Sequence, residues 1–595
     1  MDSSTALPVP TIKTRKIDEQ RTLQGVADGL HPVIARILAS RPFDEKYTAS
    51  DWLELGLQAL DAPSQLADCD KAVARIVQAM QQGEVIGIET DHDCDGQTSH
   101  AVLYEAFITF FQYPKDKIRS YIGHRLKEGY GLSDKLVDRI LADEPRPTLI
   151  ITADNGSSDE MSIARLKAQQ IDVIVTDHHE IPIEGIPQSA VAVINPTRED
   201  CDYPDRCIAG CMVAWLLMAA VRQGLLAHKF LPEIPRLGGL LDYVAVGTVA
   251  DCVSIARSKN NRIVVSKGMQ LIEKAKRPCW QALLPHLTFP LHSEDLGFKI
   301  GPLLNSDGRL ACAFGSVSFL LANDTYEAKK WYDHLSEQNV ARKSIQNRIT
   351  ETGLEQATTQ YLAGKRTLCI NMADGHAGVH GISASRIKDA FGRPTIIFCS
   401  KQDVPDVLTG SARSIPGLHL KNVLQKVKEM APESIDRFGG HEGAAGLTIP
   451  KSQITLFSEN FEKVVQNDFE AKMFGPVVWS DGELDSECLS QDFMEDLLDR
   501  LEPFGREFEP PQFEAIGQVA SLQFMGAGKN HARLGLSIDD VWVSCVWFSC
   551  RKDEQSPAPV AVGDTVKVLY SPKVETFRGN KRLTCRIVHL EQAWC

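Results

Sequence analysis

Short apolar runs alternate with helix-forming sequence in the first third of the chain. Four runs rich in Val and Ile lie between residues 81 and 196, each followed by polar or helix-forming residues: Val85–Glu89, Thr148–Ala153, Asp172–Thr176 and Val191–Ile194. Runs of this length that are apolar throughout are typical of buried parallel strands separated by helices. The pattern therefore predicts an open α/β sheet.

Three further patterns follow along the chain. Thr325–Leu362 has few glycines and many helix formers, which predicts one long helix that bridges two lobes. Strand-like runs at Thr367–Ile370 and Thr395–Phe398, with dense glycine near Gly439–Gly446, predict a second α/β domain. After Pro511, alternating short strands with turn signals predict a small β-barrel, for which the OB-fold is the simplest form.

A chain of 595 residues exceeds the length over which one hydrophobic core keeps growing, so several domains are expected. The shifts in pattern divide it into six parts: a mostly helical segment (1–80), the first α/β domain (81–275), a connector with the long helix (276–365), the second α/β domain (366–451), a helical linker segment (452–511) and the β domain (512–595).

Composition narrows the class of protein and its expected cellular location. The net charge of −14 argues against a protein that coats nucleic acid by bulk attraction, so any such site must be a local basic groove. The 15 cysteines contain no Cys-x-x-Cys pair, which indicates neither a disulfide framework nor a zinc ribbon. No apolar run approaches the roughly 20 residues of a membrane span, and residues 1–10 lack a secretory signal pattern. We therefore expect a cytoplasmic protein with no membrane partner.

Acidic residues close the predicted strands. Asp91 follows the first run, Asp154 the second and Asp177 the third. Because ligands bind at the carboxyl ends of strands in open α/β sheets, these side chains should meet in one crevice. The apolar run Leu240–Val249, closed by Asp251, supplies a fourth carboxylate for the same place.

Two of these acidic positions, Asp91 and Asp177, lie in motifs that are typical of metal-binding sites. Asp91-His92-Asp93-Cys94-Asp95-Gly96 puts three carboxylates near one point, where their repulsion is costly unless cations lie between them. Oxygen ligands suit Mg²⁺ or Mn²⁺, and the imidazoles of Asp177-His178-His179 favour Mn²⁺. A lone acidic triplet is more often a solvated loop, and a His pair is more often incidental. Their joint placement at strand ends favours the metal interpretation.

Four motifs follow one another along the chain: Asp91–Gly96, Asp154–Gly156, Val175–His179 and Gly247–Asp251. Together they resemble the motifs of the DHH phosphoesterases. Further motifs make the chain most similar, within that superfamily, to the RecJ single-stranded-DNA-specific exonucleases: His124-Arg125, Glu128–Leu132, Ile208–Gly210, Gly297-Phe298, Gly301-Pro302, Asn305, Gly308–Leu310, Gly378–Ile382, Gly410–Ser414 and Phe438–His441. The resemblance covers roughly residues 20 to 590. It implies a DHH catalytic domain, a DHH-associated domain joined to it by the long helix, and a C-terminal OB-like domain.

The resemblance implies two bound ions, Mn²⁺ or Mg²⁺. The matching ligand positions are Asp93, Asp95, Asp154, His178 and Asp251, with Asp154 bridging. Asp91 occupies the neighbourhood where simpler relatives place a His ligand. Asp177 would orient its neighbours, and His179 would face the scissile phosphate. Two ions activate water for in-line attack and stabilise the leaving 3′ oxygen.

Contacts to DNA phosphates are implied in the same way. The matching residues are Arg125, Asn305, Arg309, His380, Ser411, Arg413, Gly439, Gly440 and His441. A 5′ phosphate held by arginines and a hydroxyl would give one-nucleotide steps and 5′→3′ polarity. In the predicted barrel, basic and aromatic residues mix in a way that suits backbone tracking and base stacking: Lys529, His531, Arg533, Lys573, Arg578, Lys581 and Arg582 with Trp542, Trp547 and Phe577.

Some positions depart from the RecJ pattern. Leu303 stands where many RecJ proteins have an arginine, which removes one phosphate contact, and Ser306-Asp307 replace the usual small pair. His92 and Cys94 occupy positions that are usually aromatic and Ala, so a thiol is expected beside the metals, where it would affect oxidation sensitivity or metal preference.

The resemblance thus implies a monomeric 5′→3′ exonuclease that releases 5′-mononucleotides from single-stranded DNA in repair and recombination, with a helicase and a single-stranded-DNA-binding protein as candidate partners. One alternative is a DHH phosphodiesterase for short oligonucleotides or cyclic dinucleotides, but such proteins lack a terminal β domain like that after Gln512. The other is a non-catalytic DNA-binding scaffold. Retention of Asp or His at every expected ligand position argues against it.

Overall fold

The structure is a computed structural model that describes residues 8–124, 128–310, 313–372, 374–401, 404–577 and 580–593. The chain forms two compact units. The larger comprises Arg15–Gln338 and Asp481–Cys595, and the smaller comprises Asn339–Ser480 with the segment that ends at Thr14. The long helix α15 (Thr325–Leu362) carries the chain from the larger unit into the smaller, over the residues predicted for it.

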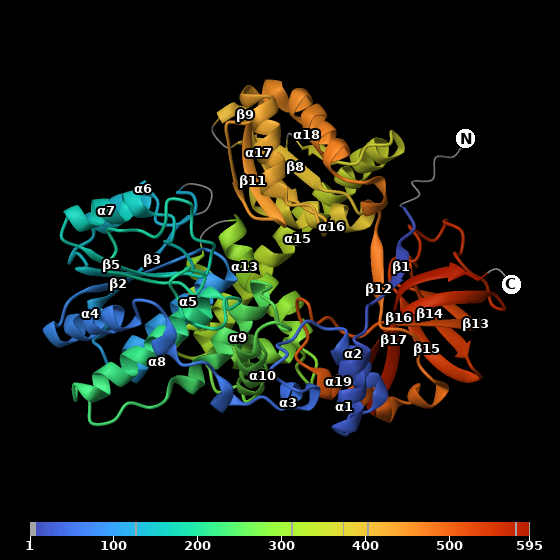
Figure 1. Cartoon of the computed structure of the whole chain (residues 1–595), viewed down its shortest axis with the longest axis horizontal. Helices are drawn as coiled ribbons and strands as arrows, with labels where there is room; N and C mark the ends of the chain where they lie inside the picture. The colour runs from blue at the N-terminus through green and yellow to red at the C-terminus, as the bar shows by residue number, and fades with distance from the viewer. Residues whose placement is uncertain are drawn as a thin grey trace. The chain divides into compact units, whose positions relative to one another are not determined.

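A five-stranded parallel sheet forms the centre of the first domain, and β2, β3 and β5 are labelled in Figure 1. The strand order is β3-β2-β4-β5-β6. Its strands are β2 (Ile86–Thr90), β3 (Ile118–Ile122), β4 (Leu149–Ala153), β5 (Asp172–Thr176) and β6 (Ala192–Ile194). Four of them agree with the predicted runs to within one residue, which confirms the α/β class. Strand β3 escaped prediction because Arg119 and Ser120 interrupt it, as an edge strand allows.

Helices cover both faces of this sheet, and β4 shows why its strands are apolar throughout. Leu149 and Ile151 belong to one buried cluster, whereas Ile150 between them belongs to another. Both faces of the sheet are therefore shielded from solvent. One cluster includes helices α4 (Cys69–Gln82), α5 (Cys94–Glu105) and α8 (Gly210–Ala227), and the other includes α6 (Asp134–Ala142) and α7 (Glu160–Ala168).

Helix α8 is long and apolar enough, by length and composition, to cross a membrane. It is the one such helix in the described ranges, and 61% of it is buried inside the fold. Its apolar side chains belong to the central hydrophobic cluster, so its composition is that of a core helix.

Other helices of the larger unit pack around this domain. They are α1 (Glu19–Ala27), α2 (Pro32–Ala39), α3 (Ala49–Leu53), α9 (Leu241–Ala250), α10 (Lys259–Glu273), α11 (Pro278–Leu283), α12 (Ser293–Asp295), α13 (Gly301–Leu310), α14 (Phe314–Leu320) and α19 (Gln491–Leu501). The apolar run that precedes Asp251 is thus the buried helix α9.

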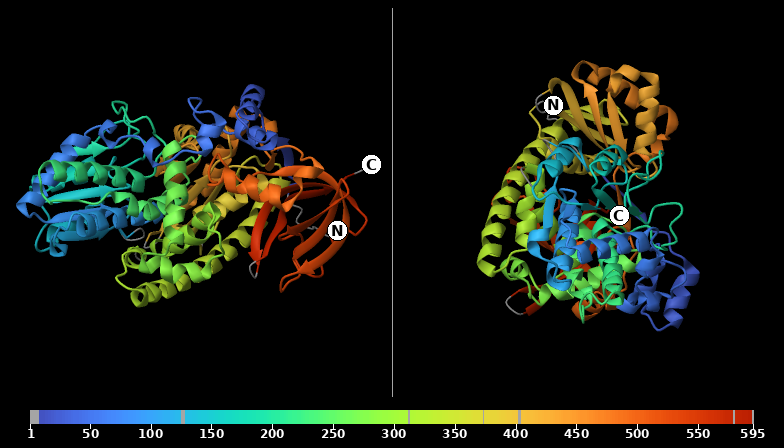
Figure 2. Two further views of the ribbon diagram at one scale, coloured as in Figure 1. Left: turned by 90° about the horizontal axis from the view of Figure 1, so that it is seen from below. Right: turned by 90° about the vertical axis from the view of Figure 1, so that its left-hand side faces the viewer.

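The C-terminal segment, drawn in red in Figure 2, folds into a closed barrel. Its strand order is β13-β14-β15-β17-β16. The strands are β13 (Phe513–Met525), β14 (His531–Ile538), β15 (Val541–Trp547), β16 (Thr565–Phe577) and β17 (Asn580–Gln592). This confirms the predicted OB-like barrel. Barrel residues such as Leu534 and Tyr570 share one buried cluster with Ile86 and Val244, so the barrel is built onto the first domain.

The smaller unit contains a five-stranded mixed sheet in the order β10-β11-β9-β8-β7. Its strands are β7 (Leu368–Asn371), β8 (Thr395–Lys401), β9 (Val404–Arg413), β10 (Arg437–Gly440) and β11 (Ala444–Pro450), and its helices are α16 (Ala377–Phe391), α17 (Leu420–Met430) and α18 (Ile454–Asp468). A separate pair, β1 (Thr11–Thr14) and β12 (Val477–Ser480), runs parallel. The second α/β domain is thus confirmed.

A buried ion pair ties α2 to the segment that leads into the barrel. The Arg41 guanidinium is 2% exposed and donates to both carboxylate oxygens of Asp481, at 2.8 and 3.3 Å. Arg15 Nε lies 3.6 Å from the same carboxylate.

We expect Arg41→Met to lower the free energy of unfolding by about 3 kcal/mol, because removing one partner leaves a buried charge that Arg15 compensates only in part. Urea unfolding followed by tryptophan fluorescence measures this. The control is Arg500→Met, which removes an exposed ion pair with Asp496 and should cost less than about 1 kcal/mol. Equal effects of the two substitutions would contradict the structural role of the buried pair.

Candidate functional site

Carboxylates from four elements meet at the carboxyl edge of the parallel sheet. Asp91 follows β2 and Asp154 follows β4, while Asp251 ends α9. Asp93 begins α5, where its side chain accepts hydrogen bonds from the backbone N–H groups of Asp95 and Gly96 at 2.9 and 3.2 Å. The side chains expected to meet at the strand ends therefore do lie together.

The His178 imidazole lies among these carboxylates. Its Nε2 is 3.1 Å from Asp154 Oδ1, 3.6 Å from Asp251 Oδ2 and 3.9 Å from Asp95 Oδ2. Side chains gather in three overlapping groups whose ligand atoms lie within 4.8 Å of one another: Asp154, His178 and His179; Asp95, His178 and Asp251; and Asp91, Asp93 and Asp154. The structure thus brings together the five predicted ligand positions and Asp91.

Burial and mutual repulsion govern the charges at this place. Burial, together with the carboxylates of Asp95 and its neighbours, raises the pKa of Asp154 well above its usual range. The same causes raise the pKa of Asp93 and of Asp251. Burial lowers the pKa of His178. Although its Nε2 lies 3.1 Å from Asp154 Oδ1, the angles do not allow a hydrogen bond, and Nε2 has no hydrogen-bond partner among the described residues. Several carboxylate oxygens and one neutral imidazole at one place fit Mn²⁺ or Mg²⁺, because a bound cation would offset the repulsion between the carboxylates.

Backbone groups hold the ligands in place. Asp95 accepts hydrogen bonds from the backbone N–H groups of Gly210 and Cys211, at 2.7 and 2.9 Å, across the N-terminus of α8. A Cβ atom at Gly210 would lie 2.7 Å from Asp154 Cβ, so only glycine fits. Asp154 itself has a φ of +65°, a conformation that favours glycine and marks local strain. Sequence patterns indicated Gly210 as part of a motif but assigned it no role.

Asp177 joins the loops that carry the ligands. Its carboxylate accepts hydrogen bonds from the backbone N–H groups of Ser157, His178 and His179 at 3.0, 2.7 and 3.1 Å. It also lies 2.7 Å from His179 Nδ1. Burial opposes a charged imidazole, but this hydrogen bond and the surrounding carboxylates raise the pKa of His179 to about 9. His179 is therefore a positively charged residue at the rim of the carboxylate cluster.

Tyr130 is a rim residue to which the sequence assigned no role. Its hydroxyl lies 3.3 Å from His179 Nε2, and its ring meets that of His92 edge-on, with 6.3 Å between the centroids. The side chain is 56% exposed. Of the predicted phosphate contacts, Arg125 lies outside the described residues.

Helix α13 supports the first acidic motif. The Asn305 side-chain oxygen accepts a hydrogen bond from the Cys94 backbone at 2.9 Å, and a Cβ at Gly308 would lie 2.3 Å from the His92 carbonyl oxygen. Asn305 thus holds the motif, while the half-buried Arg309 lies one residue beyond Gly308. The variant residue Cys94 is 1% exposed, and burial beside Asp93 raises the pKa of its thiol well above the usual range.

Two other departures from the RecJ pattern are structural in this chain. Leu303 is buried in the central cluster, so its apolar side chain packs in the core. Asp307 accepts a hydrogen bond from the Gly315 backbone at 3.1 Å and pairs with His334 at 3.3 Å, which joins α13 to α14 and α15.

In the smaller unit the structure brings together two of the predicted phosphate contacts, Ser411 and Arg413, and places His380 on the helix that packs against their strand. Arg413 Nη1 donates to Ser411 Oγ at 3.4 Å on β9, and a Cβ at Gly381 of α16 would lie 2.4 Å from Arg413 Nη2. His380 is 1% exposed, its Nε2 lacks a hydrogen-bond partner among the described residues, and burial lowers its pKa to about 4.

The predicted glycines lie in the β10–β11 hairpin beside β9. Gly440 has a φ of +142°, and a Cβ there would lie 2.3 Å from the Ala444 carbonyl oxygen, so the fold requires this glycine. A Cβ at Gly439 would meet nothing within 4 Å, so packing does not require that one. His441 is exposed, and its backbone N–H donates to Ala444 O at 2.9 Å.

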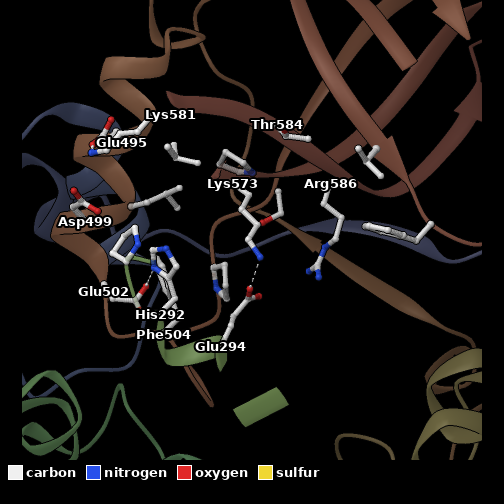
Figure 3. Close-up of a pocket in the computed structure, with 18 of the residues that line it drawn as sticks. His292, Glu294, Glu495, Asp499, Glu502, Phe504, Lys573, Lys581, Thr584 and Arg586 are labelled. Carbon is white, nitrogen blue, oxygen red and sulfur yellow. Dashed lines mark hydrogen bonds and ion pairs between the residues drawn. The ribbon is translucent and has the colours of Figure 1, made fainter. Parts of the chain in front are cut away.

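The barrel presents a pocket of about 330 Å³ against α19 (Figure 3). Two of its lysines are neutralised, since Lys573 lies 3.7 Å from Glu294 and Lys581 pairs with Glu495. Arg533 and Arg586 line the same pocket, are exposed, and take part in no ion pair with the described residues. Phe548 beside them is 53% exposed. Of the predicted basic residues, Arg578 lies outside the described ranges.

Comparison with known proteins agrees with this organisation. Three family models match the chain: the DHH family, N-terminal domain, over residues 85–248; the DHHA1 domain, over residues 364–467; and the RecJ OB domain, over residues 480–589. The single-stranded-DNA-specific exonuclease RecJ of Haemophilus influenzae is 32% identical over 94% of this chain and 96% of its own length. The chain belongs to the RecJ family.

Other members extend the similarity. RecJ of Salmonella typhimurium is 34% identical over 96% of this chain and 97% of its own length. The fold matches the crystal structure of Thermus thermophilus RecJ in complex with Mn²⁺, with a TM-score of 0.77 and 22% identity over 99% of this chain and 80% of that one. A crystal structure of exonuclease RecJ bound to manganese matches with a TM-score of 0.57 and 26% identity over 68% of this chain and 96% of that one.

We expect Asp154→Asn to abolish stabilisation of the folded protein by Mn²⁺ while leaving the metal-free fold at least as stable. The substitution removes one of several repelling charges and with it a ligand. At a hundred times its Kd, a cation should stabilise the natural protein by about 2.7 kcal/mol. Thermal unfolding with and without Mn²⁺ measures both effects.

Asp134→Asn is the matched control, because Asp134 is an exposed carboxylate at the start of α6. It should leave the Mn²⁺ response intact. A full response in Asp154→Asn would remove Asp154 from the metal centre.

Proposed function

We propose that this chain is a metal-dependent exonuclease that removes 5′-mononucleotides from single-stranded DNA in the 5′→3′ direction. The observation that carries the proposal is the cluster of buried carboxylates around His178 in a chain of the RecJ family. The closed barrel after Gln512 favours this activity over a phosphodiesterase for dinucleotides.

Most residues of the cluster would serve as metal ligands. Asp93, Asp95, Asp154, His178 and Asp251 would hold two Mn²⁺ or Mg²⁺ ions, with Asp91 close by. Such ions, when bound, activate water and stabilise the leaving oxygen.

Asp177 would act as a positioning residue, because its hydrogen bonds orient the loop of His178 and His179. The charged imidazole of His179 would face the scissile phosphate, where a fixed cation stabilises negative charge as it develops.

The proposed 5′→3′ polarity depends on the residues that would bind the terminal 5′ phosphate. A guanidinium and a hydroxyl side by side on β9 suit a phosphate, since both donate hydrogen bonds to its oxygens. We assign the terminal 5′ phosphate to Ser411 and Arg413. The proposal extends to Arg309, His380, Gly439, Gly440 and His441 as further DNA contacts, and to action as a cytoplasmic monomer in repair and recombination, beside a helicase and a single-stranded-DNA-binding protein.

Arg413→Ala should erase the preference for a 5′-phosphorylated strand over a 5′-hydroxyl strand. A charge-assisted hydrogen bond is worth roughly 1.5–3 kcal/mol, so the natural protein should show at least about a tenfold difference in kcat/KM. The measurement is kcat/KM on both strand ends. The exposed Arg165, changed to Ala, serves as control and should keep the preference. If Arg413→Ala keeps it too, the phosphate binds elsewhere.

Arg533→Gln and Arg586→Gln should weaken binding of long single strands and make it less dependent on salt. Each lost phosphate contact should reduce the slope of log K against log salt by about 0.7. Fluorescence anisotropy over a range of salt concentrations measures this. Lys552→Gln removes an exposed cation that does not line the pocket and should leave the slope unchanged. Unaltered slopes in the arginine variants would mean that the strand avoids this pocket.

A further inference from the structure

A tight turn connects α19 to the barrel at the edge of the metal centre. Gly505 and Phe508 exchange backbone hydrogen bonds at 3.0 and 3.1 Å, which leaves Arg506 and Glu507 at the tip. Glu507 has a φ of +62°, a conformation that most side chains avoid and that turns usually give to glycine. The turn keeps this strained residue because its neighbours hold it.

Both ends of the turn are anchored. Phe508 is completely buried and stacks on Phe504 with 6.2 Å between ring centroids. A Cβ at Gly505 would lie 2.5 Å from Ile255, so the turn packs directly on the loop that follows Asp251. The Ile255 backbone N–H donates to the Arg506 carbonyl oxygen at 3.1 Å.

The Glu507 side chain adds a further contact between the turn and the loop that follows Asp251. Both of its carboxylate oxygens lie 3.0 Å from Arg257 Nε. Arg257 belongs to the loop between α9 and α10, which begins at the metal-ligand position Asp251. Turn and ligand loop therefore form one rigid piece.

This arrangement fixes the place of the Arg506 guanidinium. The side chain is exposed, and Nη1 donates only a long hydrogen bond of 3.4 Å to the Cys252 carbonyl oxygen. Cys252 follows Asp251 directly, so the Arg506 guanidinium lies beside the start of the loop that carries Asp251. Arg506 takes part in no ion pair with the described residues. Its positive charge therefore lies at the edge of the acidic centre, where it attracts a polyanion.

We propose that Arg506 binds the internucleotide phosphate immediately 3′ of the scissile bond and so positions the strand over the metal centre. The inference rests on the proposed exonuclease activity. On the 5′ side of the bond an exonuclease holds a single nucleotide, so every further internucleotide phosphate lies on the 3′ side. A guanidinium presents two donors to one phosphate, and a rigid turn gives them a fixed place.

The experiment replaces the second linkage of a 5′-labelled strand by a neutral methylphosphonate. Single-turnover release of the first nucleotide is measured for the natural protein and for Arg506→Gln. The neutral linkage should lower kcat/KM of the natural protein by about tenfold or more. Arg506→Gln should show a similar loss on the ordinary strand and no further loss on the modified one. Arg506→Lys should recover part of the loss, because it keeps the charge but not the paired donors.

Arg500→Gln is the control, since Arg500 is an exposed arginine of α19 that pairs with Asp496. It should keep the natural rate and the full sensitivity to the neutral linkage. The inference is overturned if the natural protein is insensitive to the neutral linkage, or if Arg506→Gln remains as sensitive as the natural protein. Failure of the natural protein to release nucleotides from any strand would instead overturn the proposed function.

Discussion

The crowding of negative charge at one edge of a buried sheet is the constraint on which the rest of the structure depends. Asp154 is 2% exposed and lies within reach of several other carboxylates, so ionising it inside the fold is costly. A fold optimised for stability alone would place apolar side chains there. The cluster exists because cations relieve the repulsion, and this couples the stability of the fold to metal binding.

Holding such a cluster requires rigid backbone on every side. Asp95 is fixed by two backbone N–H groups of α8, and Asp177 by three from the neighbouring loops. The positive φ of Asp154 stores strain at the place where strand and loop meet. These contacts pre-organise the ligands, so little reorganisation is needed when ions and a phosphate arrive.

The barrel shares this rigidity, since its core is continuous with that of the catalytic domain. Arg262 of α10 donates to the carbonyl oxygens of Leu501 and Glu502 and thereby satisfies the C-terminus of α19. The turn that follows reaches the loop of Asp251. A barrel fixed in this way keeps a constant position relative to the carboxylate cluster, which a flexibly tethered domain cannot do.

The sequence alone determined what depends on local periodicity. Uninterrupted apolar runs predict β2, β4, β5 and β6, and a long glycine-poor stretch predicts α15. The order of the acidic motifs indicates the side chains that the structure gathers around His178. The edge strand β3 was missed because Arg119 and Ser120 hide its period. The tertiary structure alone decided the contacts between distant residues: Gly210 meets Asp95 across 115 positions, Asn305 meets Cys94 across 211, and Arg506 meets Cys252 across 254. Such pairs leave no periodic trace, because packing, and not spacing along the chain, brings them together.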